Sequence, residues 1–342
     1  MSRFLLGLAS RGYGAGVAAR LALYRARLLR TSRAARPVIS VGNVAAGGTG
    51  KTPFLAWLAA ELQARGHRPS ILTRGYGRKS RGTVVVSNGS GSMETVERSG
   101  DEPSMLARTL PDVPIVADER RVRAAATAER LFPSITHHLL DDGFSHVALE
   151  RDVDIVLLDA TDPAAGGSLL PLGRLREPLR SLQRADVVVV TKVEQADPSP
   201  AIALAERYAP GATVYRAQTE VIGILDGRGN DVEPINLPPG TVVAAAGIAR
   251  PEAFWRTLET LGIEPMASLA FPDHASYGDL RLGRILRTVE ETGACGLVTT
   301  EKDAVKLEGR LPVPLFRVRI GMRVLEPAFV PDVLAYINRL PA

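Results

Sequence analysis

Hydrophobic residues fall into short runs along most of the chain, and amphipathic stretches separate these runs. The clearest runs are PVISVGN (37–43), SILTRGYG (70–77), TVVVSN (83–88), VPIVAD (113–118), HHLLDD (137–142), DIVLLDA (154–160) and DVVVVTK (186–192). Such short apolar runs are typical of buried strands. Helical patterns cover 52–65, the residues after Glu102, and 120–131. Strands that alternate with helices predict an α/β fold, in which helices cover both faces of a parallel sheet.

A second series of strands and helices follows a stretch of different texture. Residues 208–240 consist of extended segments and a turn at LPPG. After them the pattern predicts strands in TVVAAAGIA (241–249), 265–271, 296–300 and 315–320, with helices over 251–262 and 278–292. We therefore predict a core domain over residues 37–235 and a second, smaller α/β domain over residues 236–342.

The first 36 residues differ from the rest, because they contain eight arginines and no acidic residue. Within them AGVAARLALYRARLLR (15–30) suits an amphipathic helix with Leu21, Tyr24 and Leu28 on one face. Such a helix could rest on an anionic membrane with its apolar face in the interface. Two alternatives stay open: a helix docked on the protein's own core, or an organellar transit peptide, which is also rich in arginine.

Charge and composition exclude several classes of protein. The 342 residues include 42 basic and 37 acidic side chains, but without the first 36 residues the balance is 34 basic against 37 acidic. The body is therefore not basic, and no zinc-finger spacing or aromatic RNP run is present, so we expect no nucleic-acid partner. A single cysteine excludes an intramolecular disulfide and fits a reducing compartment. No apolar run approaches the ~20 residues of a membrane-spanning helix, and FLLGLAS is too short for a secretory signal.

The stretch GNVAAGGTGKTP (42–53) has the composition and setting of a phosphate-binding loop, between a predicted strand and a predicted helix. In such a loop, backbone amides and the helix N-terminus surround a phosphate. The predicted nucleotide-binding residues are Gly47, Gly48, Thr49, Gly50, Lys51 and Thr52. Lys51 would reach the β- and γ-phosphates, and the Thr52 hydroxyl would bind Mg²⁺. Ala45 replaces the first glycine of the strict motif, so a plain glycine-rich turn is the alternative.

Two acidic clusters supply carboxylates that a P-loop enzyme would use. Asp141 and Asp142 follow a predicted strand, where a carboxylate would hold the metal. Asp101 and Glu102 precede Pro103 in SGDEP and would begin a helix. A carboxylate there could accept the proton of a hydroxyl substrate. The alternatives are a solvated acidic turn for the first cluster and a simple helix cap for the second.

Histidine and arginine residues outside these clusters complete the set of candidates. His274 lies in the predicted loop FPDHASY, from which it could reach a cleft between the domains or simply be a surface or core residue. LGRLREP presents Arg174 and Arg176 among Gly and Pro residues. TRGYGR and DERR add Arg74, Arg78, Arg120 and Arg121. Guanidinium groups can bind phosphate through paired hydrogen bonds, so these loops predict an anion-binding rim, with solvated loops as the alternative.

Several of these segments together resemble the tetraacyldisaccharide 4'-kinase family, the lipid A 4'-kinases. The matching segments are SVGNVAAGGTGKTP, LTRGYGR, GDEPSMLA, LLDDGFSH with LERDVDIVLLDA, LLPLGRLREPL, ADVVVVTK, GIARPEAFW, FPDHASY and VTTEKDAVKL. They occur in the family's order and span roughly residues 3–310. The resemblance implies an ATP- and Mg²⁺-dependent kinase that phosphorylates the 4'-hydroxyl of a tetraacylated glucosamine disaccharide 1-phosphate. The product would be the bis-phosphorylated lipid A precursor. The family acts at the cytoplasmic face of the bacterial inner membrane, with a membrane-associating N-terminal helix, which removes the transit peptide alternative.

The resemblance also implies roles for individual residues. Asp101 would accept the proton, with His274 as its supporting partner and Lys51 as a third catalytic residue. Metal binding would fall to Thr52, Asp141, Asp142 and Glu102, and substrate binding to Arg74, Arg121, Arg176 and His146. Ser145 is a departure, because the family usually has Gln in DDGFQH. Two other functions remain as alternatives: a P-loop ATPase with a regulatory or membrane-assembly role, and a nucleotide-gated membrane-binding module.

Overall fold

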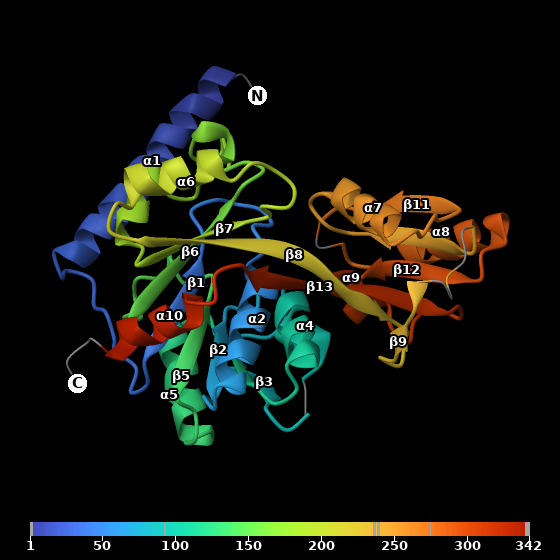
Figure 1. Cartoon of the computed structure of the whole chain (residues 1–342), viewed down its shortest axis with the longest axis horizontal. Coiled ribbons are helices and arrows are strands. Elements are labelled where there is room, and N and C mark those ends of the chain that lie inside the picture. The colour runs from blue at the N-terminus through green and yellow to red at the C-terminus, as the bar shows by residue number, and fades with distance from the viewer. Residues whose placement is uncertain (1–2, 92–93, 235–236, 238–239, 274, 339–342) are drawn as a thin grey trace.

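The computed structural model describes residues 3–91, 94–234, 237, 240–273 and 275–338. Its strands are β1 (Val38–Gly42), β2 (Pro69–Thr73), β3 (Val84–Asn88), β4 (Pro114–Ala117), β5 (His137–Asp141), β6 (Val153–Asp159), β7 (Val187–Thr191), β8 (Thr213–Leu225), β9 (Asp231–Val232), β10 (Val242–Ala246), β11 (Ala267–Ala270), β12 (Gly296–Thr300) and β13 (Leu315–Val324). They form one sheet in the order β11-β10-β12-β13-β8-β7-β6-β1-β5-β2-β4-β3, with β9 paired to β8 (Figure 1). The predicted α/β fold is confirmed.

The helices flank this sheet. They are α1 (Arg3–Arg25), α2 (Lys51–Ala64), α3 (Val96–Ser99), α4 (Asp101–Thr109), α5 (Arg121–Leu131), α6 (Ser199–Tyr208), α7 (Pro251–Thr260), α8 (Asp279–Thr292), α9 (Glu301–Leu307) and α10 (Phe329–Asn338), with short 3₁₀ turns at Ala165–Gly167 and Leu179–Arg184. The hydrophobic pattern predicted α2, α4, α5, α7 and α8 within a few residues. It did not predict α3, α6, α9 and α10.

The central strands of the first half, β1, β5 and β6, are buried along their whole length. β1 lies between β5 and β6, and all three run parallel. Ile39 and Val41 face a core that includes Phe54 of α2, whereas Val38 faces a second core that includes Ala124 of α5. Because both faces are covered, alternation of polar and apolar residues is absent from these strands. The carboxyl ends of β1 and β5 therefore meet at one edge, with Val41 opposite Asp141.

The second half repeats this arrangement on a smaller scale. β10 pairs in parallel with β11 and β12, and β12 pairs in parallel with β13. Ala245 and Leu297 contribute to one core on one face, and Ala244 and Val298 contribute to another on the opposite face. Residues of this half thus have hydrophobic cores of their own.

An antiparallel pair of long strands joins the two halves. β8 and β13 pair from Leu225 opposite Arg317 to Ala217 opposite Val324, with a register shift after Arg319 (Figure 1). The end of β13 and the whole of α10 return to the first half, where Phe329 packs in the same core as Phe54. The last part of the chain therefore packs with the first half, and the predicted domain boundary at residue 236 stays a prediction.

Helix α1 begins and ends earlier than the pattern predicted. It ends at Arg25, and Arg27 adopts a positive φ of 56°, which a right-handed helix cannot continue. The Ser10 hydroxyl donates a hydrogen bond to the Leu169 carbonyl at 2.9 Å, and the Tyr13 hydroxyl donates one to the Arg176 carbonyl at 3.0 Å. One face of α1 is thus docked on the protein, whereas Phe4 near its start is 79% exposed. Within the described residues, no helix combines the length and apolar character needed to span a bilayer.

Candidate active site

The phosphate-binding loop runs from β1 into α2, as predicted. Gly50 caps the helix with a positive φ of 84°, which side-chain-bearing residues rarely adopt, and a Cβ there would lie 2.6 Å from Met322 Cε, so a larger residue would be strained. Gly47 and Gly48 are exposed, whereas Thr49 is buried. The Thr191 hydroxyl at the end of β7 donates to the Thr49 carbonyl at 3.0 Å. A neighbouring strand end therefore holds the loop in place and leaves its glycines facing solvent.

Lys51, the first residue of α2, lies among polar groups at the mouth of this loop. Its Nζ donates to Asn43 Oδ1 at 3.1 Å and lies 3.4 Å from Asp142 Oδ1. Asp142 also accepts a hydrogen bond from Arg176 Nη1 at 2.7 Å. Burial acts to raise the pKa of Asp142, but the charges of Lys51 and Arg176 outweigh burial and hold that pKa below its usual value. Asp142 is therefore ionised and links two residues that the sequence placed in separate motifs.

Asp141, the other member of the acidic pair, has a raised pKa, whereas that of Asp142 is lowered. Asp141 ends β5, is buried, and accepts a hydrogen bond from the Thr73 hydroxyl at 2.8 Å. Burial and the nearby charges of Glu102 and Asp142 raise the pKa of Asp141 to about 6. A buried carboxyl beside two other acids is stabilised in its charged form by a cation. Asp142 and Glu102 thus lie close enough to Asp141 for their charges to raise its pKa, and the metal site stays a prediction.

These acids alone do not form a complete metal cage. Among the described residues, no group of three His, Cys, Asp or Glu side chains converges as a ready-made ion-binding site. Mg²⁺ in phosphotransferases is usually held by one or two carboxylates, substrate phosphates and water. Hard oxygen donors on Asp141, Asp142 and Thr52 beside a phosphate-binding loop therefore fit Mg²⁺ held together with a nucleotide.

Asp101 begins α4, as predicted, but it does not cap the helix. Gly100 occupies the cap with φ 94°, and a Cβ there would lie 2.7 Å from the Tyr76 carbonyl. This close approach packs the SGDEP turn against the loop that carries Arg74. Asp101 Oδ2 accepts a hydrogen bond from Lys306 Nζ of α9 at 2.9 Å. The alternative of a simple helix cap is thus wrong, and the carboxylate meets a residue of the second half.

Arg121 and His146 form the basic side of the site. Arg121 is 4% exposed at the start of α5, and burial lowers its pKa even though Asp141 and Asp142 act in the opposite direction. Burial, followed by the charge of Arg121, lowers the pKa of His146 to about 4, so this imidazole is neutral near pH 7. Within the part of the chain that the structure describes, Arg121 Nε and His146 Nε2 are buried without a hydrogen-bond partner. A bound ligand or an ordered water would satisfy such groups.

The segment that carries Arg176 lies along the phosphate-binding loop. The Arg176 amide donates to the Val44 carbonyl at 2.7 Å, and the Ala46 amide donates to the Arg174 carbonyl at 2.7 Å. Glu177, 1% exposed, anchors the segment through Arg184 at 2.9 Å. Ser145, the departure from the family pattern, donates to Glu177 Oε1 at 2.7 Å. Ser145 therefore supports the Arg176 segment in this chain.

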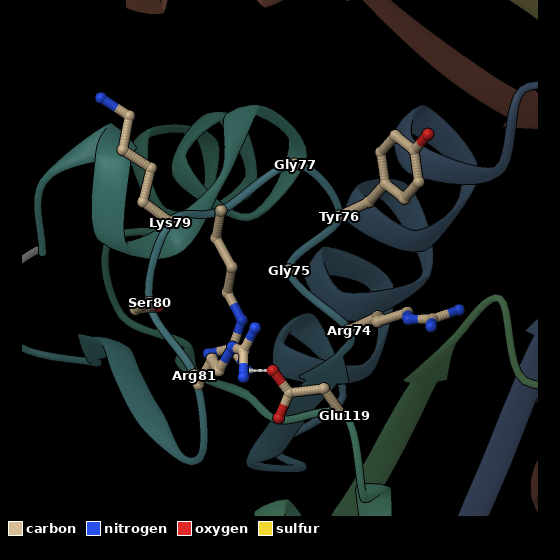
Figure 2. A pocket seen from close by; sticks show the side chains of 9 residues that line it. Arg74, Gly75, Tyr76, Gly77, Lys79, Ser80, Arg81 and Glu119 are labelled. Carbon is tan, nitrogen blue, oxygen red and sulfur yellow. Dashed lines mark hydrogen bonds and ion pairs between the residues drawn. The ribbon is translucent and has the colours of Figure 1, made fainter.

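Arg74 lies on the rim of a polar pocket of about 400 Å³, formed by the loop after β2 and Glu119. Figure 2 shows the Arg74 side chain extending away from Glu119. Glu119 forms an ion pair with Arg78 at 2.6 Å. Arg74 is exposed, and its charge is one of those that lower the pKa of His146. The structure thus groups Arg74, Arg121 and His146. Arg78 instead forms an ion pair with Glu119.

Sequence reasoning missed several residues of this region. They are Asn43, which bonds Lys51; Arg20 of α1, which lies 3.8 Å from Glu177; Glu177 itself, which anchors the Arg176 segment; and Lys306, which bonds Asp101. Asn43, Glu177 and Lys306 had a signal, since each lies in a segment that carried the family resemblance: SVGNVAAGGTGKTP, LLPLGRLREPL and VTTEKDAVKL. Arg20 lies in none of the quoted segments. His274, the predicted partner of Asp101, lies outside the described residues.

The fold and these groups define a P-loop nucleotide-binding protein of the α/β class, whose acidic pair and helix-start carboxylate suit phosphoryl transfer. A family model for Tetraacyldisaccharide-1-P 4'-kinase, LpxK, matches residues 2–338. The chain therefore belongs to this family, and the resemblance inferred from its motifs is confirmed.

Individual relatives agree with the family model. The tetraacyldisaccharide 4'-kinase of Anaeromyxobacter sp. (strain Fw109-5) is 44% identical over 298 residues, which cover 86% of this chain and 80% of that protein. The enzyme of the same name from Pelobacter propionicus is 41% identical over 320 residues, 92% of this chain and 87% of its own length. The crystal structure of LpxK from Aquifex aeolicus in complex with ATP is similar over 99% of both chains, with 33% identity and a TM-score of 0.81.

Proposed function

We propose that this chain is an ATP-dependent lipid A 4'-kinase, which transfers the γ-phosphate of ATP to the 4'-hydroxyl of tetraacyldisaccharide 1-phosphate. Membership of the tetraacyldisaccharide-1-P 4'-kinase family supports this activity. Contacts around the acidic pair are the structural support for it. Lys51 of the phosphate-binding loop forms an ion pair with Asp142. The charge of Glu102, the residue after Asp101, helps to raise the pKa of the neighbouring Asp141. These contacts support a site in which the phosphate-binding and acceptor-activating groups lie close together.

The phosphate-binding loop would hold the triphosphate. Amides of residues 47–52 and the N-terminus of α2 provide donors and partial positive charge for the phosphates. The Lys51 ammonium, now 3.4 Å from Asp142, would interact with the β- and γ-phosphates. Catalysis of phosphoryl transfer consists mostly of positioning and charge stabilisation, which these groups can supply.

A magnesium ion is the second requirement that we propose. Thr52, Asp141, Asp142 and Glu102 are the residues that would hold it. When bound, Mg²⁺ would neutralise the charge on the β- and γ-phosphate oxygens. The raised pKa of Asp141 supports this assignment, because a carboxyl buried beside like charges is relieved by a bound cation.

Asp101 would activate the acceptor. The proton of the 4'-hydroxyl passes to the Asp101 carboxylate as the hydroxyl oxygen bonds to the γ-phosphorus. The bond between the γ-phosphorus and the bridging oxygen breaks, and its electron pair stays on ADP. His274 remains the predicted supporting partner of Asp101. Arg74, Arg121, Arg176 and His146 would bind the anionic sugar phosphate, and the unpartnered Arg121 Nε and His146 Nε2 support this role.

The lipid acceptor implies a membrane surface. We propose that the protein acts as a peripheral or monotopic enzyme at the cytoplasmic face of the bacterial inner membrane. The eight arginines of residues 1–36 and the exposed Phe4, Leu5 and Leu8 of α1 support contact with an anionic bilayer.

The decisive experiment supplies both substrates. Purified protein is incubated with γ-labelled ATP and tetraacyldisaccharide 1-phosphate in detergent micelles, and the label is located on the lipid. We expect label at the 4'-position and dependence on Mg²⁺. ATP hydrolysis that is independent of lipid would instead favour a regulatory ATPase. ATP-dependent vesicle binding without labelled lipid would favour a membrane-binding module.

A further inference from the structure

The carboxylate that we assign to acceptor activation is held by a residue of the other half of the molecule. Lys306 is near the end of α9, and its Nζ donates to Asp101 Oδ2 at 2.9 Å. Both side chains are largely buried, with 11% of Lys306 and 19% of Asp101 exposed. A partly buried, charge-assisted hydrogen bond of this kind constrains both groups more than a solvated surface pair does.

The same ammonium also binds the loop that follows β11. Lys306 Nζ donates to the Ala275 carbonyl at 3.0 Å and lies 5.7 Å from the centre of the Tyr277 ring. One turn earlier on α9, Lys302 pairs with Asp273 at 3.1 Å. The two lysines, four residues apart and thus on one face of the helix, contact the loop on both sides of position 274.

Helix α9 is itself fixed firmly in the second half. Thr300 caps it by accepting a hydrogen bond from the Asp303 amide, and Asp303 is completely buried. The position of Lys306 is therefore set by the sheet of the second half, whereas Asp101 belongs to α4 of the first half. The Lys306 ammonium connects the two.

We propose that Lys306 is a positioning residue for the reaction: its ammonium orients the Asp101 carboxylate toward the acceptor hydroxyl and ties it to the loop at residues 271–277. This inference rests on the proposed function, since it assigns Asp101 to the acceptor. A misplacement of a catalytic group by about 1 Å can cost on the order of 10²-fold in rate. Loss of the ammonium is therefore expected to affect turnover more than nucleotide binding.

A second ion pair between the same helices offers a matched control. Arg108, near the end of α4, pairs with Glu308, which directly follows α9, and Glu308 also pairs with Arg317 at 3.1 Å. Arg108→Gln removes a contact between α4 and α9 without touching Asp101, and Glu308 keeps a partner. If Lys306 merely joins the two helices, the two substitutions will have similar effects.

The test measures transfer of γ-phosphate to tetraacyldisaccharide 1-phosphate by the full-length protein. We expect Lys306→Met to lower kcat roughly 10- to 100-fold, with the KM for ATP changed less than about threefold. Lys306→Arg keeps a charged donor and should recover most of the loss. Arg108→Gln should stay within about twofold of wild type. Melting temperatures of all variants verify that they are folded.

A double-mutant cycle isolates the pair. In an Asp101→Asn background, Lys306→Met should change the residual kcat by less than about threefold, because the two residues act as a unit. Near-normal turnover of Lys306→Met, an equal loss in Arg108→Gln, or a full additional loss in the Asp101→Asn background would each overturn the role of Lys306. Wild-type protein that labels no lipid would overturn the proposed function itself, and with it this role.

Discussion

Each half of the sheet has a glycine-containing turn directly after a strand, β1 in the first half and β10 in the second. The two turns differ in whether a side chain of the protein occupies them. After β1, Gly47 and Gly48 are exposed to solvent. After β10, the Gly247 amide donates to Asp303 Oδ2 at 2.9 Å, and a Cβ on Gly247 would lie 2.8 Å from Asp303 Oδ1. A carboxylate of the chain thus occupies the second turn, whereas the first is available to a phosphate.

The comparison shows that similar architecture does not bring similar chemistry. The buried Asp303 that fills the turn of the second half also belongs to α9, the helix that presents Lys306 to Asp101. The second half therefore uses its glycine turn to anchor a helix, and among the described residues it contacts Asp101 through the Lys306 ammonium. The first half contributes the phosphate-binding loop and the acidic pair. Variants in each half should separate these contributions.

The largest effect is expected for Asp101→Ala. Removal of a general base typically lowers turnover by ~10²–10⁴-fold, so kcat for lipid phosphorylation should fall by that order. The variant should still bind ATP, because nucleotide binding is assigned to the other motif. Steady-state transfer assays and equilibrium nucleotide binding measure the two properties. Turnover close to that of wild type would contradict the assignment of Asp101.

Lys51→Met tests the first half directly. Loss of a preorganised charge that stabilises the transition state costs about 10²–10³-fold in kcat, and ATP binding should weaken as well. Arg65→Met, an exposed residue just beyond the other end of α2, serves as the control and should have normal activity. Equal kinetics of the two variants would show that Lys51 does not contact the phosphates.

Asp303→Ala tests the filled turn of the second half. It removes the carboxylate that bonds the Gly247 amide and the Thr300 hydroxyl. We expect a decrease of about 2 kcal/mol in the free energy of unfolding, measured with urea. Asp279→Ala, at an exposed acid in the first turn of α8, should change it by less than about 1 kcal/mol. A free energy of unfolding equal to that of wild type would contradict the role of Asp303 as the group that anchors this turn.

Asp141→Asn tests the electrostatics of the acidic pair. The pKa of Asp141 is raised to about 6 in the folded protein from a usual value of 3.8, so the folded state holds this proton more tightly than the unfolded state. The stability due to this group is therefore present below pH 4 and is lost as the pH rises to about 6. Without metal at pH 7, Asp141→Asn should be more stable than wild type by about 1–3 kcal/mol.

The pH dependence supplies the control for that prediction. At pH 4 the wild-type carboxyl is protonated and neutral like the amide, so the stability difference should nearly vanish. Urea unfolding with a chelator at both pH values measures it. A difference that does not change with pH would mean that the electrostatic environment of Asp141 is not the cause. Transfer activity should be lost in either case if Asp141 holds the metal.

Most of the fold could be predicted because its strands are buried on both faces. Runs such as PVISVGN and DVVVVTK are mostly apolar, and each contains a strand of the sheet. Helices α6, α9 and α10 were missed: α9 is only seven residues long, and α10 is apolar because it packs against Phe54 and Trp57. Their helical state depends on packing partners that are distant in the sequence.

The individual residues of the site could be predicted from the sequence, but the ion pairs between them could not. Lys51, Asp142 and Arg176 were each named from local motifs, yet the ion pairs that join them through Asp142 arise from three separate segments. Arg78 was placed in an anion-binding rim, but Glu119 occupies it. A motif states which chemical group is available, whereas the partner of that group depends on how loops pack.

The amino-acid sequence by itself determined the α/β class, the phosphate-binding loop and the family, because apolar periodicity and short-range glycine patterns are local properties of the chain. Only the tertiary structure decided that α1 docks on the segment carrying Arg176, that β13 and α10 return to the first half, and that Lys306 meets Asp101 across 205 positions of sequence. Those contacts form when folded elements pack against each other, so their distances are set by the sheet and its cores rather than by spacing along the chain.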